Sequence, residues 1–278
     1  MIFTQLVKAL CLCSLLLVPF TVGQNTSEHE FNKRRTLSIG IIIFDGFEPI
    51  EVWGPLEYLT SPTKLSAFYK MTLSIISYQK GPVKGTVSAR LQPHLGGDFG
   101  STLGAETAVT HTFADAPALD VILIPGGTGV INATLSNRTE IEEFLIRRAD
   151  QAEYILGLSF GVTHLARSGL LNSKRATTNK SGYQWIVNYG PEVNWVPQAR
   201  WVVDGKFWTA SGMMASLDMT YAWLSHVYGA EGPVNQQTNS IEYAPHLDSS
   251  WDPYAVVFNV PGANASRPSQ DCVGPIGR

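Results

Sequence analysis

Cysteine is scarce in this chain. Among 278 residues there are only three, and two of them, Cys11 and Cys13, lie in an apolar stretch at the start. The mature protein would keep Cys272 alone, which excludes a scaffold of disulfides within the chain. No cluster of cysteine and histidine has the spacing of a zinc site, so the sequence predicts neither a metal nor a cofactor.

Charge is scarce as well. Asp, Glu, Lys and Arg make up 15% of the residues, and the formal net charge is −3. Because there is no basic surplus to neutralise phosphates, we expect no nucleic-acid partner. The 44% of hydrophobic residues is typical of a folded globular protein with one large core or two small ones. After the start of the chain no apolar run is long enough to cross a membrane.

The first residues are typical of a signal peptide. Lys8 precedes the apolar run from Ala9 to Val22, which ends at the small residue Gly23. The run is shorter than the ~20 residues that a membrane helix needs, and its end resembles a cleavage site, so an uncleaved anchor is the lesser alternative. We expect a protein that is secreted or resides in the secretory pathway. Some of its five Asn-x-Ser/Thr sequons would then be glycosylated, the candidates being Asn25, Asn132, Asn137, Asn179 and Asn264.

From Thr36 onward, short β-branched runs alternate with amphipathic stretches, which predicts a mostly parallel sheet covered by helices on both faces. The stretch Glu140–Ala149 has helical spacing. We divide the chain into a signal peptide (1–23), a polar spacer (24–35), an α/β domain (36–229) and an irregular C-terminal extension (230–278) wrapped on the domain. The predicted strands are Leu37–Phe44, Met71–Ser77, Val121–Pro125 and Tyr154–Leu158.

The end of the domain carries two further local patterns. The segment Arg200–Trp208 is predicted to be a β-hairpin, because its central Asp-Gly accepts the positive φ values of a two-residue turn. Ser211 is expected to cap the helix that follows. The core face of that helix is expected to hold Met214, Leu217, Tyr221 and Leu224.

The strongest chemical signal is the pentapeptide Gly157–Gly161, which fits Gly-x-Ser-x-Gly. It follows the strand Tyr154–Leu158 and precedes a helix-like segment, which is the setting of a nucleophile elbow. Ser159 would be the nucleophile, and the helix amino terminus would offer N–H groups to a developing anion. The alternative is a tight turn in which Ser159 only caps the helix.

Two other segments should reach the same edge of the sheet. The glycine-rich loop Pro125–Gly129 follows one strand, and Glu51 lies near the start of a helix that follows another. Ligands of open α/β sheets bind beyond the carboxyl ends of the strands, so both segments are expected near Ser159. Glu51 would then be a general base or orienting acid whose pKa is raised by burial. The alternatives are a turn that needs glycine for its shape alone and a glutamate that only favours the helix dipole.

No histidine completes a catalytic triad in the sequence. His164 lies five positions beyond Ser159, which turns it away on a helix, and His226 is expected on the outer face of its helix. A serine esterase remains an alternative, and it would need an Asp and a His after the nucleophile, for which Asp218 and His246 are the candidates.

The order and spacing of these motifs resemble the DJ-1/PfpI superfamily, the class I glutamine amidotransferase-like fold, over about Thr36 to Gly229. The resemblance implies a flavodoxin-like three-layer α/β/α sandwich, a homodimer, and an oxyanion pocket from the backbone at Gly127 and Phe160. It also implies a catalytic carboxylate at Glu51. The motifs that carry it are Gly46–Glu57, Asp120–Gly129, the elbow and Ala166–Thr178. The segments similar to fungal, isonitrile hydratase-like members are Ala176–Lys180, Val193–Trp195, Ala199–Gly205 and Ser250–Pro253.

The chain departs from the family pattern at two site positions. Ser159 stands where the family carries its nucleophilic cysteine, and Asn179, placed among the substrate-binding residues, stands where many members have a histidine. A serine hydroxyl needs a base to become nucleophilic, and Glu51 is the candidate that the resemblance supplies. Phe160 removes a hydroxyl that would contact substrate.

Three functional hypotheses follow. The first is a family enzyme that uses Ser159 and Glu51 to hydrolyse or hydrate a small carbonyl or isonitrile-type metabolite, in fungal secondary metabolism as the resemblance suggests. The second is a pseudoenzyme that binds a small ligand or partner in the same cleft without turnover. The third is the serine esterase.

Overall fold

The computed structural model describes residues 26–60, 70–87, 102–264 and 266. The predicted signal peptide and Asn25 lie outside these residues. A seven-stranded sheet with the order β10-β11-β7-β6-β1-β2-β5 forms the centre of the domain, and all its pairs are parallel except β10–β11. Its strands are β1 (Thr36–Ile42), β2 (Lys70–Ser77), β5 (His111–Thr112), β6 (Val121–Ile124), β7 (Tyr154–Leu158), β10 (Trp201–Asp204) and β11 (Phe207–Ala210). The predicted parallel sheet and the hairpin are therefore confirmed.

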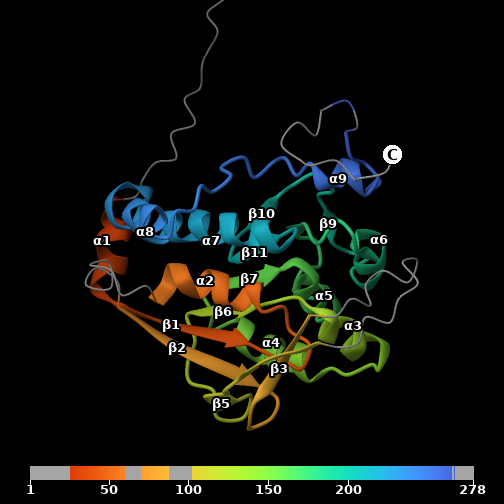
Figure 1. Ribbon diagram of the computed structural model, residues 1–278, viewed down its shortest axis with the longest axis horizontal. Helices are drawn as coiled ribbons and strands as arrows, with labels where there is room; N and C mark the ends of the chain where they lie inside the picture. Colours follow the sequence, from red (N-terminus) through yellow and green to blue (C-terminus); the bar gives the residue numbers. More distant parts are fainter. Residues whose placement is uncertain (1–25, 61–69, 88–101, 265, 267–278) are drawn as a thin grey trace, which may run out of the picture.

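Helices cover both faces of the sheet, which gives the predicted three layers. One layer contains α1, α2 and α7, in which α7 contacts both of the others, and the other layer contains α4 and α5 (Figure 1). The chain moves from β1 to β2 in one direction along the sheet and from β6 to β7 in the opposite direction. Because such crossovers are right-handed, the helix between β1 and β2 and the helix between β6 and β7 lie on opposite faces. The helices are α1 (Thr26–Arg34), α2 (Ile50–Thr60), α3 (Thr128–Leu135), α4 (Glu140–Ala149), α5 (Val162–Arg167), α6 (Tyr183–Ile186), α7 (Met213–Tyr228), α8 (Asn235–Ser240) and α9 (Tyr254–Val257).

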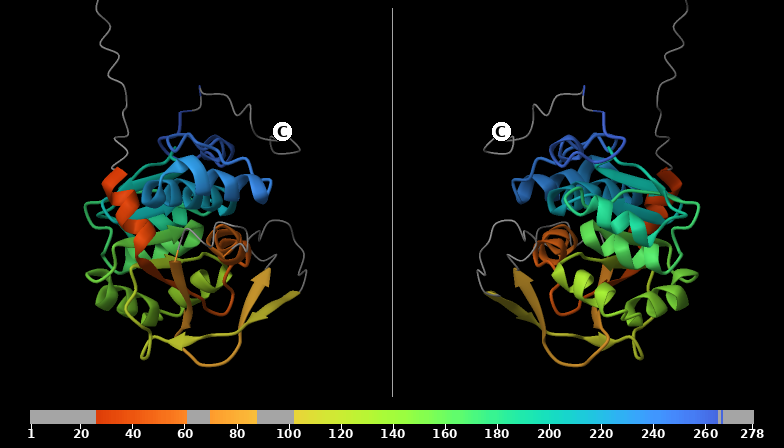
Figure 2. Two further views of the ribbon diagram at one scale, coloured as in Figure 1. Left: turned by 90° about the vertical axis from the view of Figure 1, so that its left-hand side faces the viewer. Right: turned by 90° about the vertical axis from the view of Figure 1, so that its right-hand side faces the viewer.

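Small strand pairs lie outside the main sheet. The hairpin of β3 (Val83–Val87) and β4 (Thr102–Thr107) projects at the end of the molecule opposite the C-terminal segment (Figure 2). A parallel pair joins β8 (Arg175–Ala176) to β9 (Asn194–Trp195) and fixes the segment that follows β8 beside the carboxyl edge of β7.

The core consists of the apolar strand runs, as the sequence predicts. The side chains of β6 and β7 are buried throughout, because both faces of a parallel sheet are covered by helices. The predicted core face of α7 is correct at Leu224, which is 1% exposed, and at Tyr221, which packs against the core, but it is wrong at Met214, which is 46% exposed. The buried stripe of α7 is instead Ala215, Met219, Trp223 and Val227, which faces the sheet at a spacing of four residues.

The polar spacer and the C-terminal extension, of which the second was expected to be irregular, both contain helices. The polar spacer forms α1, which packs on α7, where the Asn32 amide donates to the Val227 carbonyl at 3.0 Å. The C-terminal extension contains α8 and α9. Its apolar side chains Ala255 and Val260 pack on Tyr183 of α6.

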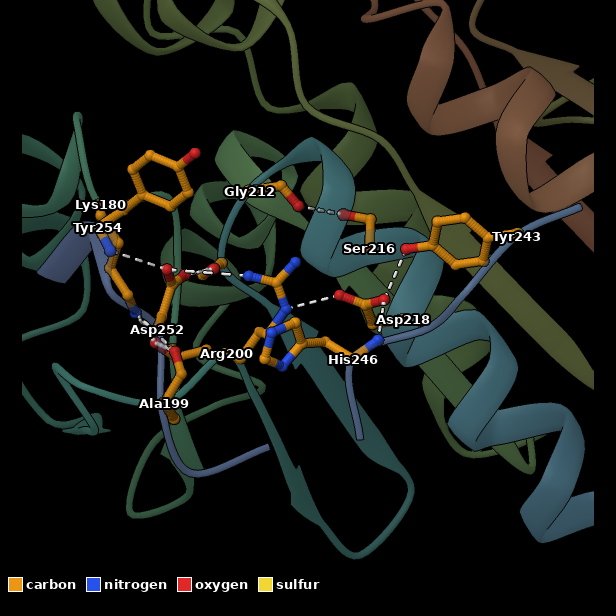
Figure 3. Close-up of polar contacts among 12 residues, drawn as sticks. Lys180, Ala199, Arg200, Gly212, Ser216, Asp218, Tyr243, His246, Asp252 and Tyr254 are labelled. Atoms are coloured by element: carbon orange, nitrogen blue, oxygen red, sulfur yellow. Dashed lines mark hydrogen bonds and ion pairs between the residues drawn. The ribbon is translucent and has the colours of Figure 1, made fainter. Parts of the chain in front are cut away.

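A buried polar cluster also holds the extension to the domain (Figure 3). Arg200 Nε donates to Asp218 Oδ2 at 2.5 Å, and Tyr243 of the extension donates its hydroxyl to Asp218 Oδ1 at 2.5 Å. Asp252 of the extension accepts the hydroxyl proton of Ser211. The expected capping role of Ser211 is therefore wrong: Gly212 is the N-cap of α7, and the Ser211 hydroxyl serves the extension.

Candidate active site

Ser159 occupies a strained turn at the carboxyl end of β7. Its φ is +52°, a left-handed conformation that non-glycine residues rarely adopt and that is typical of functional turns. The turn continues as a 3₁₀ helix, Ser159–Gly161, that leads into α5. A Cβ on Gly161 would lie 2.4 Å from the Ile124 carbonyl oxygen, and one on Gly157 would lie 2.7 Å from Leu165. Gly161 is therefore required by backbone packing, as a nucleophile elbow predicts, whereas a Cβ on Gly157 would require the Leu165 side chain to move.

Glu51 lies in the first turn of α2 and is completely buried. Its Oε2 accepts the backbone N–H of Gly126, from the loop after β6, at 2.5 Å. Burial raises the pKa of Glu51 to about 8, while the hydrogen bonds from Gly126 and Ser159 act in the opposite direction. At neutral pH the side chain is therefore predominantly the neutral acid, and it can donate a proton.

Asn179 forms a hydrogen bond with the Ser159 hydroxyl. Its Nδ2 donates to Ser159 Oγ at 3.0 Å. The orientation of the amide follows from its oxygen, which accepts the Ser181 hydroxyl at 2.6 Å and the Gly182 N–H at 3.1 Å. Because Asn179 donates, Ser159 Oγ is the acceptor of this bond, and its own proton remains available to another group.

The backbone around Ser159 converges on a small space. A Cβ on Gly126 would lie 2.8 Å from the Phe160 nitrogen and 2.9 Å from Glu51 Oε2, so only glycine leaves room there. Gly127 has a φ of +123° and faces the turn at Gly46–Glu48 rather than Ser159. The structure thus places Glu51, Gly126 and Phe160 together, with Gly127 one residue away from them along the loop.

Two polar side chains of the segment after β8 were not singled out from the sequence. Thr178 donates its hydroxyl to the Ser159 carbonyl at 2.8 Å and so fixes the turn. Lys180 is buried and donates to Thr177 Oγ1 at 2.6 Å and to the Ala199 carbonyl at 2.8 Å (Figure 3). Burial lowers the pKa of Lys180 to about 7, with Asp252 opposing the shift. The signal for both was the polar run Ala-Thr-Thr-Asn-Lys directly after a short strand.

His164 and His246 have their contacts away from Ser159. His164 Nδ1 contacts Glu142 Oε1 at 2.9 Å, on the far side of α5. The Asp218 and His246 pair that an esterase would use belongs to the cluster that anchors the extension, where the His246 backbone N–H donates to Asp218 at 2.8 Å. The geometry favours the carboxylate–serine arrangement over the esterase triad.

The described sequons differ in accessibility. Asn132, Asn137 and Asn264 are exposed, whereas Asn179 is half-buried. The Nδ2 atom that a glycan would modify at Asn179 is the atom that donates to Ser159, so glycosylation there would replace this contact.

Within the part of the chain that the structure describes, no group of three or more His, Cys, Asp or Glu side chains could hold a metal ion. Among the same residues, no helix is both long enough and apolar enough to span a membrane.

Known proteins share this fold and this order of segments. The family model described as "DJ-1/PfpI family" matches residues 37–226. An isonitrile hydratase from Pseudomonas putida is 28% identical over 210 residues, which cover 75% of this chain and 79% of that protein. The crystal structure of a ThiJ/PfpI family protein from Pseudomonas syringae matches with a TM-score of 0.61 at 21% identity, over 76% of this chain and 77% of that one. Drosophila melanogaster DJ-1beta matches with a TM-score of 0.55 at 19% identity, over 76% and 100%. With its elbow, its buried glutamate and a match over most of the domain, the chain belongs to the DJ-1/PfpI family.

Proposed function

We propose that this protein hydrates the terminal carbon of a small isonitrile, with Ser159 and Glu51 as its catalytic residues. The observation that carries the proposal is the Ser159 hydroxyl, held by Asn179 at 3.0 Å beside a buried, neutral Glu51. The similarity to a protein named isonitrile hydratase supports the substrate class.

Burial of the site favours a slim, uncharged reacting group. Ser159 is 2% exposed and Glu51 is 0% exposed. A charged substrate group would therefore lose its hydration on entry, and no opposite charge is described at Ser159 to compensate for this loss. An isonitrile presents a linear –N≡C end that carries no net charge. This end reaches the hydroxyl with less displacement of neighbouring side chains than a branched ester or amide requires.

The proposed first step is proton transfer from Glu51. The Glu51 carboxyl gives its proton to the terminal isonitrile carbon, which becomes a strongly electrophilic nitrilium carbon. Ser159 Oγ then forms a bond to this carbon, and its hydroxyl proton passes to the Glu51 carboxylate. The product is an imidate ester on Ser159, and Glu51 is again neutral. A carboxyl group with a pKa near 8 serves both transfers, because it starts protonated and ends protonated.

Water completes the proposed reaction. A water molecule adds to the imidate carbon and one of its protons goes to the nitrogen, which gives a tetrahedral intermediate. The bond from this carbon to Ser159 Oγ then breaks, the remaining hydroxyl proton returns to Ser159, and an N-substituted formamide leaves. Asn179 Nδ2 and the backbone N–H of Phe160 are the donors available to steady charge on oxygen in these steps.

A direct assay tests the proposal. Purified protein is incubated with n-butyl isonitrile, and N-butylformamide is measured by mass spectrometry. We expect turnover in the wild type, loss in Ser159→Ala and Glu51→Gln, and faster reaction in Ser159→Cys, because a thiol is the better nucleophile. Ser240→Ala, which removes an exposed hydroxyl on α8, is the matched control. Equal rates in all these forms would refute the roles of Ser159 and Glu51.

Labelling with a fluorophosphonate separates chemistry from substrate choice. A single adduct that Ser159→Ala abolishes would show an activated serine even if the isonitrile is not the substrate, and esters, amides and small carbonyl compounds would then be screened. No adduct and no turnover would support the pseudoenzyme hypothesis, in which the same cleft binds a small ligand without reaction.

We also propose that the protein is a secreted glycoprotein that acts on a small metabolite of fungal secondary metabolism. The signal-peptide pattern and the exposed Asn132, Asn137 and Asn264 support secretion and glycosylation. Expression from the full reading frame in a eukaryotic host should yield protein in the medium that begins at Gln24 and loses mass on deglycosylation. Retention in the cell with an intact leader would contradict this.

A homodimer is proposed from an exposed apolar patch on α2 and α7. Ile50, Trp53, Met213 and Met214 are between 37% and 46% exposed, and the two helices pack side by side. Light scattering should give twice the monomer mass, and Trp53→Glu should shift it to the monomer. A monomeric wild type would refute the proposal.

A further inference from the structure

Lys180 is a buried side chain that the proposed reaction does not use. It is 4% exposed, and it lies one residue beyond Asn179, whose amide donates to Ser159 Oγ at 3.0 Å. Lysine is seldom buried unless its amine is paired, because the ammonium group loses its hydration there. The partners of Lys180 therefore indicate what it does in this fold.

The amine of Lys180 joins two segments of the chain. Nζ donates to Thr177 Oγ1 at 2.6 Å, within the segment 177–180, and to the Ala199 carbonyl at 2.8 Å, 19 positions away in the sequence (Figure 3). Burial lowers the pKa of Lys180 to about 7. A neutral amine still has two N–H groups, so both hydrogen bonds can form in either protonation state.

The C-terminal extension holds the Ala199 carbonyl in place. The residues on both sides of Ala199 bond to the extension: the Gln198 carbonyl accepts the Asp252 N–H at 2.6 Å, and the Arg200 N–H donates to the Ser249 carbonyl at 2.8 Å. Lys180 therefore donates to a point that is fixed from both sides.

The segment that Lys180 fixes is the one that contacts Ser159. Thr178 donates its hydroxyl to the Ser159 carbonyl at 2.8 Å, and Asn179 Nδ2 donates to Ser159 Oγ at 3.0 Å. Both residues lie between Thr177 and Lys180, the two partners of the Nζ–Oγ1 bond. The φ of Ser159 is +52°, a strained conformation that persists only where its surroundings hold it. A small displacement of the segment would weaken both contacts, because hydrogen bonds depend steeply on distance and angle.

From these contacts we propose that Lys180 is a positioning residue for the reaction at Ser159. It fixes the segment 177–180 against the extension and so keeps Asn179 Nδ2 at the Ser159 hydroxyl. The role rests on the proposed function, in which Asn179 Nδ2 steadies charge on oxygen at Ser159. The extension then has a part in the site as well, because it holds the carbonyl to which Lys180 donates.

A double-mutant cycle in the isonitrile assay tests this role, because two residues that act through one contact do not contribute additively. We expect Lys180→Met to lower kcat about tenfold and to leave KM within about twofold, since it displaces a donor at Ser159 Oγ without removing a group that binds the substrate. In the Asn179→Ala background the same change should lower kcat less than about threefold. Lys174→Met, which changes an exposed lysine just before β8, is the matched control and should leave kcat unchanged.

Two kinetic results would overturn the proposal. One is a wild-type kcat in Lys180→Met. The other is a loss of about tenfold or more in the Asn179→Ala background, which would show that Lys180 acts through its charge or on the fold as a whole. Urea unfolding verifies that each variant is folded. If Lys180→Met does not fold, Thr177→Val replaces it in the cycle, because it removes the oxygen that accepts Lys180 Nζ at 2.6 Å.

The exchange of the Asn179 side-chain amide with water tests the same contact without a substrate. NMR of the full mature protein labelled with ¹⁵N-asparagine follows the Nδ2 protons, and Asn179→Ala identifies their signals. We expect exchange to become at least about tenfold faster in Lys180→Met, as in Ser159→Ala, which removes the acceptor. Unchanged exchange in Lys180→Met would overturn the proposal even if the isonitrile is hydrated. If the wild type hydrates no isonitrile, the proposed function fails, and the exchange rate still decides whether Lys180 holds Asn179.

Discussion

Replacing Glu51 with glutamine should make the protein more stable at neutral pH, although it abolishes the proposed activity. Glutamine has nearly the same shape as the neutral acid, and its oxygen can accept the Gly126 N–H that Glu51 accepts at 2.5 Å. Its amide nitrogen takes the place of Oε1, which has no hydrogen-bond partner among the described residues of the wild type either. The change therefore removes a titratable group from a fully buried position without creating a cavity.

The size of the effect follows from the pKa of Glu51, which burial raises from 4.5 to about 8. Between these values the folded state holds a proton that the unfolded chain has lost. Stability is therefore fully present below pH 4.5 and falls as pH rises toward 8, at about 1.4 kcal/mol per pH unit. Glutamine has no such dependence. From pH 5 to pH 7 the free energy of unfolding of the wild type should fall by about 3 kcal/mol relative to Glu51→Gln.

Urea unfolding followed by tryptophan fluorescence at pH 5, 6 and 7 measures this difference. The matched control is Glu57→Gln, which removes an exposed carboxyl from the same helix and should change the free energy by less than about 0.5 kcal/mol. Parallel profiles for the wild type and Glu51→Gln would refute the reasoning, because they would show that Glu51 is ionised in the folded protein. The role of Glu51 as the proton donor would then fail as well.

Three further predictions concern packing and charge. Gly126→Ala should abolish activity in the isonitrile assay, because its Cβ would lie 2.8 Å from the Phe160 nitrogen, and unchanged turnover would contradict the close packing. Asp218→Ala should cost about 2–4 kcal/mol in urea unfolding, since it removes the nearer carboxylate of the buried Arg200 guanidinium, at 2.5 Å, and leaves only Asp252 at 3.9 Å, and a loss below about 1 kcal/mol would count against this. Lys180→Met should be stabilising at pH 7, by an amount that shrinks as pH rises toward 10. The reason is that the lowered pKa of Lys180, about 7, makes the wild type more stable as pH rises. If the free energies of unfolding of the two proteins differ by the same amount at every pH, Lys180 does not titrate in this range.

Local sequence was sufficient for the elements of the sheet. Strands such as Val121–Ile124 are buried on both faces, so nearly every residue is apolar and the run stands out without knowledge of its neighbours. The helix Glu140–Ala149 has the bounds that its spacing and its acidic first turn predict. Gly-Leu-Ser-Phe-Gly marked the turn at Ser159, because the pattern directly after an apolar strand is typical of a nucleophile elbow and Gly161 packs closely against backbone.

Only the tertiary structure decided the chemistry of the site. Asn179 reaches Ser159 across 20 positions of the chain, and Glu51 receives the Gly126 N–H across 75. Burial by distant segments, not the local sequence, raises the pKa of Glu51 and makes it an acid rather than a base at neutral pH. Ser211 has the sequence of a cap but bonds to Asp252, because the extension returns 41 residues later and offers a buried carboxylate. Propensity and periodicity describe what a residue does with its near neighbours, whereas protonation and partner choice depend on which segments the fold brings together.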